Sequence, residues 1–271
     1  MAEDPGWAPP EVDTTRANTA RVYDYWLGGT HNFLPDQDLA RAIVAVNPYM
    51  RETVRANRAF LRRAVRFLAA QGITQFLDIG SGIPTQGNVH EVAQQASPGA
   101  RVVYVDTDPV AIAHSKAILA GNPDAAIIDA DLREPEKILA HDVTRQLLDL
   151  SQPTALLLGA VLHFIGDGED PHGIVATLRD GLAPGSYLVA SHATDDESTA
   201  QLQAAGKAYN AKSAVHLRMR SRPEVSRFFD GFELMEPGVV WLPLWRPDSP
   251  ADVPADPSRL AGWVGVGCKP G

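Results

Sequence analysis

Short apolar runs alternate with helical patterns through the middle of this chain. Both kinds of segment have lengths that are typical of the strands and helices of globular proteins. The predicted strands are 75–79, 101–105, 125–129, 154–159 and 186–191, and the predicted helices between them are 85–96, 109–120, 135–150 and 171–182. Such alternation requires a parallel sheet that helices cover on both faces, with right-handed crossovers. We therefore predict a doubly wound α/β fold.

The two ends of the chain have other patterns. Residues 1–15 contain several prolines and predict a flexible arm. Residues 16–72 predict a helical N-terminal cap, followed by the α/β domain over 73–271. Two of the late strand-like runs predict an antiparallel hairpin at the edge of a mostly parallel, seven-stranded sheet. The remaining predicted helices are 18–28, 36–47, 52–70, 197–212 and 222–230, and the late strand-like runs are 232–235, 239–242 and 262–266.

The first predicted strand of the α/β domain ends in an acidic residue and a glycine-containing turn. Gly80 and Gly82 have no Cβ, so both can adopt positive φ and bring main-chain N–H groups against a ligand. Asp78 adds a carboxylate that only accepts hydrogen bonds, which suits an ammonium group. The turn is typical of a place where a nucleotide-like ligand reaches bare backbone.

Two more predicted strands end in acidic residues. Asp106 follows the second strand, 26 residues after Gly80, which is close to one βαβ step. A carboxylate at this place can accept hydrogen bonds from two ribose hydroxyls. Asp129 and Asp131 follow the third strand, so three neighbouring strands present an acid at the carboxyl edge of the sheet. For Asp108, Asp129 and Asp131 the alternative role is helix capping or turn stabilisation.

These motifs resemble those of the Rossmann-like S-adenosylmethionine-dependent methyltransferases. That family has a strand ending in D-x-G-x-G, a second ending in an acid and a third followed by an A-D-L-like segment. The matching positions are 78–82, Asp106 and 130–132.

Longer stretches resemble one branch of that family, the S-adenosyl methyltransferases formerly classified as a domain of unknown function. The similarity spans most of the chain, from about residue 16 to residue 247. It implies no particular methyl acceptor. The stretches that carry it are 23–29, 84–90 and 182–187.

The resemblance implies S-adenosylmethionine as the cofactor. Gly80, Ser81 and Gly82 then contact the methionine portion, Asp78 binds its ammonium group directly or through water, and Asp106 binds the ribose. The other cofactor-binding residues are expected to be Thr107, Ala160, Asp131 as the acceptor for the adenine amino group, and Leu132 with its N–H at the ring edge.

Two histidines follow predicted strands at the same edge of the sheet. His163 comes after the fourth strand and His192 after the fifth, and imidazole titrates near neutral pH. Either residue is therefore a candidate general base, although a packed, hydrogen-bonded histidine is the common alternative.

Aromatic and amide residues of the cap are candidates for binding the methyl acceptor. Tyr23, Tyr25 and Trp26 recur at helical spacing, and Asn32 follows the double glycine. Simple packing is the alternative for all four.

The segment 159–162, Gly-Ala-Val-Leu, stands where amino-group methyltransferases of nucleic acid and protein have an N-P-P-Tyr type motif. Its presence favours a small-molecule acceptor.

Composition narrows the set of partners. The 24 basic and 33 acidic residues leave a net charge of −9, which disfavours a nucleic-acid substrate. The arginines between Arg51 and Arg66 are expected on the solvated face of an amphipathic helix rather than in a phosphate site. The scattered histidines and the single Cys268 predict neither a metal site nor an internal disulfide. No apolar stretch reaches about 18 residues, so we predict a cytoplasmic protein without a membrane span.

Two other functions fit the same fold. A nicotinamide-dependent oxidoreductase is disfavoured because its fingerprint calls for a third glycine at position 85, where this chain has Thr85. A protein that binds S-adenosylmethionine without turnover, as a sensor or scaffold, is the second alternative. The preferred hypothesis is an S-adenosylmethionine-dependent methyltransferase with a small-molecule acceptor.

Overall fold

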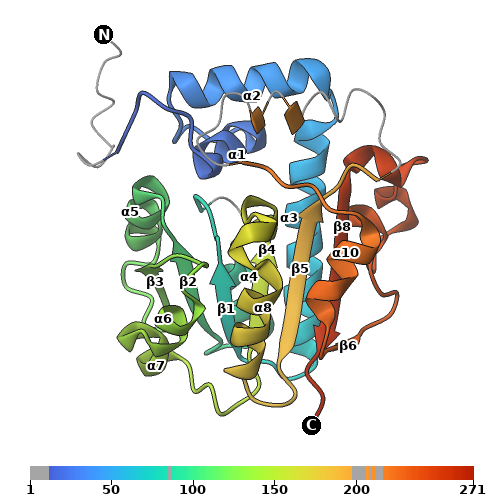
Figure 1. Ribbon diagram of the computed structural model, residues 1–271. Helices are drawn as coiled ribbons and strands as arrows, with labels where there is room; N and C mark the ends of the chain where they lie inside the picture. Colours follow the sequence, from blue (N-terminus) through green and yellow to red (C-terminus); the bar gives the residue numbers. More distant parts are fainter. Residues whose placement is uncertain (1–11, 85–86, 197–205, 208, 211–215) are drawn as a thin grey trace.

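One mixed β-sheet of eight strands forms the centre of the described molecule. The structure is a computed structural model that describes residues 12–84, 87–196, 206–207, 209–210 and 216–271. The strands are β1 (Gln75–Ile79), β2 (Arg101–Asp106), β3 (Ala125–Asp129), β4 (Ala155–Gly159), β5 (Tyr187–Ala193), β6 (Glu233–Leu234), β7 (Val240–Trp241) and β8 (Gly262–Cys268). Their order is β3-β2-β1-β4-β5-β8-β6, with β7 also paired to β8 (Figure 1). The first five strands are parallel, as predicted, and β8 is antiparallel to β5, β6 and β7.

Helices cover both faces of the sheet. Successive strand residues pack on opposite faces, because side chains alternate along a strand. Phe76 packs on the face that carries α3 (Met50–Ala70) and α4 (Val89–Ala96), whereas Leu77 packs on the face that carries α8 (Pro171–Asp180). The central strands are thus buried on both sides, which explains their nearly unbroken apolar sequence.

The other helices follow the predicted order. The α-helices are α1 (Thr19–Leu27), α2 (Leu34–Val46), α5 (Pro109–Ile118), α6 (Pro135–Ala140), α7 (Asp142–Leu147) and α10 (Arg222–Ser226). The short 3₁₀ helices are η1 (Leu162–Phe164), η2 (Asp167–Glu169), η3 (Arg227–Phe229), η4 (Leu242–Leu244), η5 (Pro250–Asp252) and η6 (Pro257–Leu260).

Beyond shifts at the ends of elements, the structure differs from the prediction in three places. The helix expected at 222–230 is the short helix α10 followed by the 3₁₀ helix η3. The single helix expected at 135–150 is two short helices, because His141 has an extended backbone, with φ −60° and ψ 136°, and caps α7 with its side chain. The sheet has eight strands rather than seven, because β6 and β7 are separate short strands that both pair with β8. Most of the helix predicted near 197–212 and most of the arm over 1–15 lie outside the described residues.

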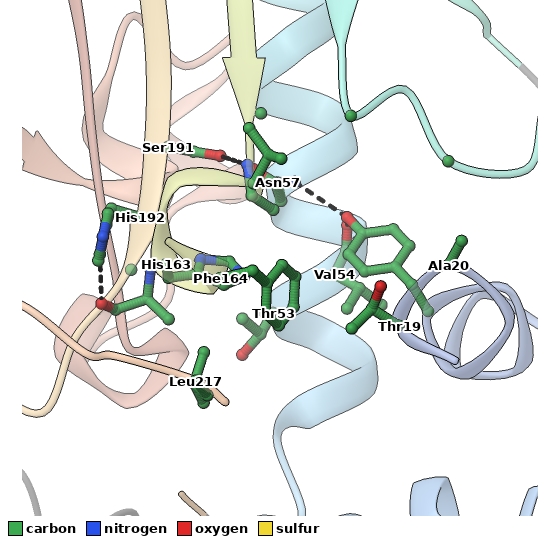
Figure 2. Close-up of a pocket in the computed structure, with 18 of the residues that line it drawn as sticks. Thr19, Ala20, Thr53, Val54, Asn57, His163, Phe164, Ser191, His192 and Leu217 are labelled. Atoms are coloured by element: carbon green, nitrogen blue, oxygen red, sulfur yellow. Dashed lines mark hydrogen bonds between the residues drawn. The ribbon is translucent and has the colours of Figure 1, made fainter. Parts of the chain in front are cut away.

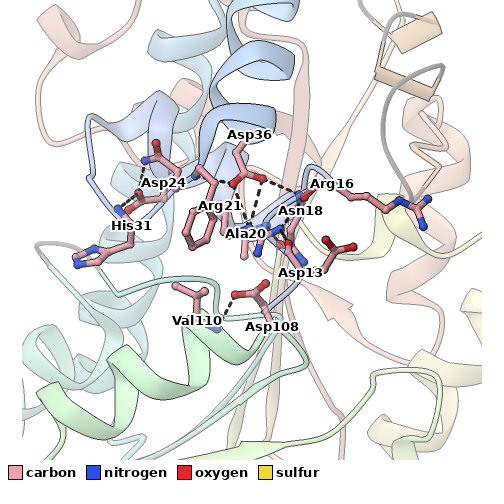
Figure 3. Close-up of polar contacts among 12 residues, drawn as sticks. Asp13, Arg16, Asn18, Ala20, Arg21, Asp24, His31, Asp36, Asp108 and Val110 are labelled. Carbon is pink, nitrogen blue, oxygen red and sulfur yellow. Dashed lines mark hydrogen bonds and ion pairs between the residues drawn. The ribbon is translucent and has the colours of Figure 1, made fainter. Parts of the chain in front are cut away.

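The N-terminal helices α1 and α2 lie above the carboxyl ends of the parallel strands, and α3 runs down beside the sheet (Figure 1). A buried ion pair holds this arrangement: Nε of Arg21 lies 3.2 Å from a carboxylate oxygen of Asp36 (Figure 3). Asp36 also accepts hydrogen bonds from the N–H groups of Asn18 and Phe33, so one carboxylate joins the starts of α1 and α2. These contacts place α1 over the edge where the predicted site lies.

Candidate active site

A cavity of about 290 Å³ lies at the carboxyl edge of the sheet, beneath α1 and beside α3. Figure 2 shows how distant segments meet there: Thr19 comes from α1, Val54 and Asn57 come from α3, His163 comes from η1 after β4, and Ser191 comes from β5. All the residues that the sequence assigned to the cofactor line this one cavity. They are Asp78, Gly80, Ser81, Gly82, Asp106, Thr107, Asp131, Leu132 and Ala160.

The glycine turn after β1 has the predicted backbone but uses its N–H groups differently. Gly80 has φ +73° and Gly82 has φ +68°. The N–H groups of Gly80 and Ser81 donate to the carbonyl of Val105, at 2.8 and 3.2 Å. The N–H of Gly82 donates to a carboxylate oxygen of Asp106 at 2.7 Å. All three N–H groups hold the turn against the end of β2. A ligand at this turn therefore contacts Cα and carbonyl groups and not these N–H groups.

The two glycines have different surroundings. A Cβ built on Gly80 would lie 2.4 Å from Cγ2 of Val161, so Gly80 is required for packing. A Cβ on Gly82 would meet nothing within 4 Å. The space over Gly82 is open, and it is the part of the turn where a ligand can approach the backbone.

Asp78 is a buried carboxylate that no described residue hydrogen-bonds. Its side chain ends β1 and lines the cavity, and the residue is only 5% exposed. Burial raises its pKa to about 7, and the nearby Asp106 adds to this rise while Arg58 opposes it. Such a group is stabilised in its charged form when a cation binds beside it.

Asp106 organises the loop after β2 and retains acceptor capacity. One oxygen accepts from Gly82, and the other accepts from the N–H groups of Thr107 and Asp108 at 2.8 and 2.9 Å. Burial raises the pKa of Asp106, and these hydrogen bonds oppose the rise. A carboxylate offers about four acceptor positions, so room remains for a ligand hydroxyl.

Asp131 and Leu132 line the cavity after β3. One oxygen of Asp131, Oδ1, accepts from the backbone and side chain of Arg133. Arg133 also donates to Glu169 and to the carbonyl of Phe164, which links this loop to the loop after β4. Among the described residues, none donates to Oδ2 of Asp131, and Leu132 is buried beside it.

The prediction of a fully solvated arginine face on α3 was wrong at two positions. The apolar residues of the helix are buried as expected. However, Arg63 is 7% exposed and donates to the carbonyls of Trp245 and Leu242. Arg58 lines the cavity next to Asp78, and none of the described residues hydrogen-bonds its buried Nε. Sequence periodicity missed Arg58 because it cannot show that the polar edge of a helix faces an inner cavity.

Both ring nitrogens of His192 are occupied. Nδ1 lies 2.7 Å from the carbonyl of Ala193, so it carries the proton and donates. Nε2 accepts from the guanidinium of Arg220 at 3.0 Å. Burial lowers the pKa of His192, with His163 and Arg220 as further causes.

His163 has a partner for only one of its ring nitrogens among the residues that the structure describes. Its Nδ1 accepts from the N–H of Ala193 at 3.2 Å, so the neutral ring carries its proton on Nε2. Burial, aided by the charge of Arg220, lowers the pKa of His163 to about 3. Near neutral pH His163 therefore lines the cavity as a hydrogen-bond donor.

The four cap residues that were candidates for the acceptor site separate into two pairs. Tyr23 and Trp26 line the cavity. The hydroxyl of Tyr23 donates to the carbonyl of Val54 and accepts from Asn57, and the indole N–H of Trp26 donates to the carbonyl of Ala40. The structure does not bring the other pair to the cavity. Tyr25 packs against Arg41 and Arg51, and Asn32 is held by Asp24, Gly29 and Gln37.

This geometry agrees with the family that the sequence motifs resemble. A family model described as S-adenosyl methyltransferase matches residues 5–270. The chain belongs to this family. Its cofactor is therefore S-adenosylmethionine, and its class of activity is methyl transfer.

Two solved structures resemble the whole chain. A candidate methyltransferase from Thermobifida fusca YX is 42% identical, with a TM-score of 0.92, and the match covers 98% of this chain and 99% of that one. A DUF574 family protein from Streptomyces avermitilis MA-4680 is 39% identical, with a TM-score of 0.91 and coverage of 95% and 99%.

A more distant structure shows the same fold. The N-methyltransferase NodS from Bradyrhizobium japonicum WM9, in complex with S-adenosyl-L-homocysteine, is 14% identical, with a TM-score of 0.50 and coverage of 87% and 98%.

No curated protein matches the chain. Within the described part of the chain, no helix combines the length and apolarity needed to cross a membrane. Nor do the described residues contain a group of three His, Cys, Asp or Glu side chains that could hold a metal.

Proposed function

We propose that this methyltransferase acts on a small-molecule acceptor, with the cofactor and the acceptor side by side in the 290 Å³ cavity. The observation that supports this best is the buried carboxylate of Asp78, which shares the cavity with the open space over Gly82. A buried carboxylate without a partner is costly, and a cationic ligand offsets that cost. The bound cofactor supplies an electrophilic methyl group on a sulfonium sulfur.

The residues around Asp78 fit the two ends of an amino-acid group. Asp78 binds the ammonium of the methionine portion. Arg58, whose buried Nε has no partner within the described part of the chain, binds its carboxylate. The two side chains already influence one another, since Arg58 lowers the pKa of Asp78. Opposite charges set side by side match the opposite charges of the ligand.

The other cofactor contacts follow from acceptor positions that the protein leaves open. Asp106 accepts from ribose hydroxyls with its remaining capacity, and Thr107 lies beside it. Oδ2 of Asp131 accepts from the adenine amino group, with Leu132 at the ring edge. Ala160, held at φ +56° by hydrogen bonds from its N–H to Ser191, borders the methyl-transfer region.

The two histidines take different roles in this proposal. His192 is a structural residue, because neither of its nitrogens is available. His163 donates a hydrogen bond from Nε2 and orients the acceptor. Positioning and exclusion of water then account for the rate enhancement, since an in-line displacement requires alignment above all.

Calorimetry with S-adenosylhomocysteine tests the cofactor assignment. The protein should bind S-adenosylhomocysteine but not NADH. Asp106→Ala should weaken binding by at least about tenfold, which corresponds to about 1.4 kcal/mol. The matched control is Asp129→Ala, which removes an exposed acid at the end of the neighbouring strand, outside the cavity.

Methyl transfer is tested separately, with methyl-labelled S-adenosylmethionine and a panel of small molecules. Label in a panel member supports the proposal. Binding of S-adenosylhomocysteine without transfer to any acceptor would favour a sensor or scaffold. Failure of the wild-type protein to bind S-adenosylhomocysteine would overturn the assignment of the site.

A further inference from the structure

Charge is unevenly distributed around the cavity. The charged side chains in its described lining belong to the cofactor half, over β1, β2 and β3: Arg58, Asp78, Asp106, Asp131 and Arg133. The other half lies over β4, β5 and β8 and beside α2 and α3, and we call it the acceptor half. The described lining of the acceptor half contains no Lys, Arg, Asp or Glu.

The acceptor half is mainly apolar. Its walls include Ile43, Met50, Val54, Phe164, Leu217 and Met219. The ring of Phe164 is stacked with that of Tyr209, with centroids 6.0 Å apart and planes at 29°. Burying a charged molecule here is costly, because no described side chain supplies the opposite charge. An uncharged acceptor with a flat apolar ring fits this lining.

The described residues of the acceptor half also lack an available base. His192 has no free nitrogen, and Nδ1 of His163 is occupied by the N–H of Ala193. Tyr23 remains protonated near neutral pH, because burial raises the pKa of its phenol. A hydroxyl acceptor must lose its proton to a base for efficient transfer. A neutral nitrogen uses its lone pair directly and needs no base in the bond-forming step.

We propose that the methyl acceptor is the nitrogen of an uncharged, mainly apolar aromatic amine or nitrogen heterocycle; this inference rests on the proposed function. The nitrogen lone pair forms a bond to the methyl carbon while the carbon–sulfur bond breaks and its electron pair stays on sulfur. The positive charge thus passes from sulfur to nitrogen. An aromatic amine then releases its N–H proton to water, whereas a pyridine-type ring nitrogen has no proton to release and leaves the site as a cation. Aliphatic amines are excluded because they are already protonated at neutral pH.

Two polar groups can orient such a ring. His163 donates from Nε2. Asn57 on α3 also lines the cavity (Figure 2), and its buried Oδ1 has no hydrogen-bond partner among the described residues. A few fixed polar groups in an apolar site are the usual source of orientation for small ligands.

Three compounds of the same ring system test the proposal: naphthylamine, naphthol and naphthylmethylamine, the last of which is protonated at neutral pH. Their binding is measured by calorimetry on the protein saturated with S-adenosylhomocysteine. Naphthylamine and naphthol should bind similarly, and naphthylmethylamine should bind at least about tenfold more weakly. With S-adenosylmethionine, mass spectrometry should find a methylated product from naphthylamine only.

A matched pair of variants checks that these probes occupy the acceptor half. Leu217→Lys puts a charge into its wall and should weaken naphthylamine binding by about tenfold without changing the affinity for S-adenosylhomocysteine. Leu234→Lys, at an exposed position of β6 away from the cavity, should change neither.

The outcomes separate the two proposals. Methylation of naphthol as fast as naphthylamine, equal binding of the charged amine, or no binding of either neutral probe would overturn the assignment of the acceptor. Each of these results counts against the acceptor alone when S-adenosylhomocysteine still binds. Loss of S-adenosylhomocysteine binding in the wild-type protein would instead remove the proposed function itself.

Discussion

Arg220 donates a hydrogen bond from its guanidinium to Nε2 of His192, across 3.0 Å. This contact leaves His192 only one nitrogen that can carry a proton, Nδ1, which donates to the carbonyl of Ala193. The N–H of Ala193 in turn donates to Nδ1 of His163. The backbone of one residue therefore connects both imidazoles: Arg220 and the carbonyl of Ala193 set the tautomer of His192, and the N–H of Ala193 sets that of His163.

Replacing Arg220 should both destabilise the protein and raise the pKa of His192. Arg220 is 1% exposed and donates to the carbonyls of Leu162 and Ile165, which would lose their partners. Arg220→Met should lower the free energy of unfolding by about 3 kcal/mol. It should also raise the pKa of His192, because the charge of Arg220 lowers that pKa in the wild type.

Chemical denaturation and NMR titration of the histidine C–H signals measure these two effects. Arg222→Met is the control, because Arg222 is exposed. Equal stability of the two variants, or an unchanged titration of His192, would contradict the proposed network.

Replacing Asp78 should stabilise the protein without ligand and weaken cofactor binding. The folded pKa of about 7 lies above the ordinary value of 3.8. Between these two pH values the folded state holds a proton that the unfolded state has lost, so stability falls as pH rises through this window. Each pKa unit corresponds to about 1.4 kcal/mol, so the cost of ionising Asp78 approaches about 4 kcal/mol above pH 7.

Asp78→Asn removes this cost. Thermal unfolding without ligand should show the variant more stable than the wild type at pH 8, with the difference disappearing near pH 4. Wild-type affinity for S-adenosylhomocysteine should increase with pH up to about 7, since the ammonium needs the ionised carboxylate. In the variant that affinity should be lower and independent of this titration. An equally steep pH dependence in Asp78→Asn would assign the effect to another group.

Alanine variants of three glycines with positive φ distinguish a loss of ligand binding from a loss of stability through backbone strain. Gly72, Gly80 and Gly82 have φ +88°, +73° and +68°. Alanine at each position should lower the free energy of unfolding by about 1 kcal/mol, because a residue with a Cβ is strained in the left-handed conformation. Gly80→Ala should cost more, because its Cβ collides with Val161. Gly82→Ala should keep most of its stability but lose affinity for S-adenosylhomocysteine.

Gly72→Ala is the control for conformational strain alone, since Gly72 also has nothing within 4 Å and lies outside the cavity. Calorimetry and denaturation on the three variants make the comparison. If Gly82→Ala binds S-adenosylhomocysteine as tightly as Gly72→Ala, the open space over Gly82 is not the ligand site.

Two arginines of α3 allow a matched test of the carboxylate contact. Arg58 lines the cavity, whereas Arg55 is exposed on the same helix. Arg58→Met should weaken the binding of S-adenosylhomocysteine by about tenfold or more, because a charge-assisted hydrogen bond contributes about 1.5–3 kcal/mol. Arg55→Met should have no effect. Decarboxylated S-adenosylhomocysteine should bind wild type and Arg58→Met equally, and a persistent difference with this ligand would show that Arg58 acts elsewhere.

The parallel strands, the glycine turn and the acids that follow three strands could all be predicted from the order of the residues. These features are local: strand length, apolar content and the conformational freedom of Gly80 and Gly82 can be read from neighbouring residues. Parallel strands place their carboxyl ends on one edge, so Asp78, Asp106 and Asp131 converge without further information.

Which histidine nitrogens and which cap residues remain available to a ligand could not be predicted, because this depends on how distant elements pack. The partners of His192 and His163 come from Arg220 and Ala193, and Arg58 faces the cavity because of how α3 packs beside the sheet. Tyr25 is turned away by the same kind of helix packing. Hydrogen bonds between distant segments depend on the relative placement of whole elements, and no local pattern of residues specifies that placement.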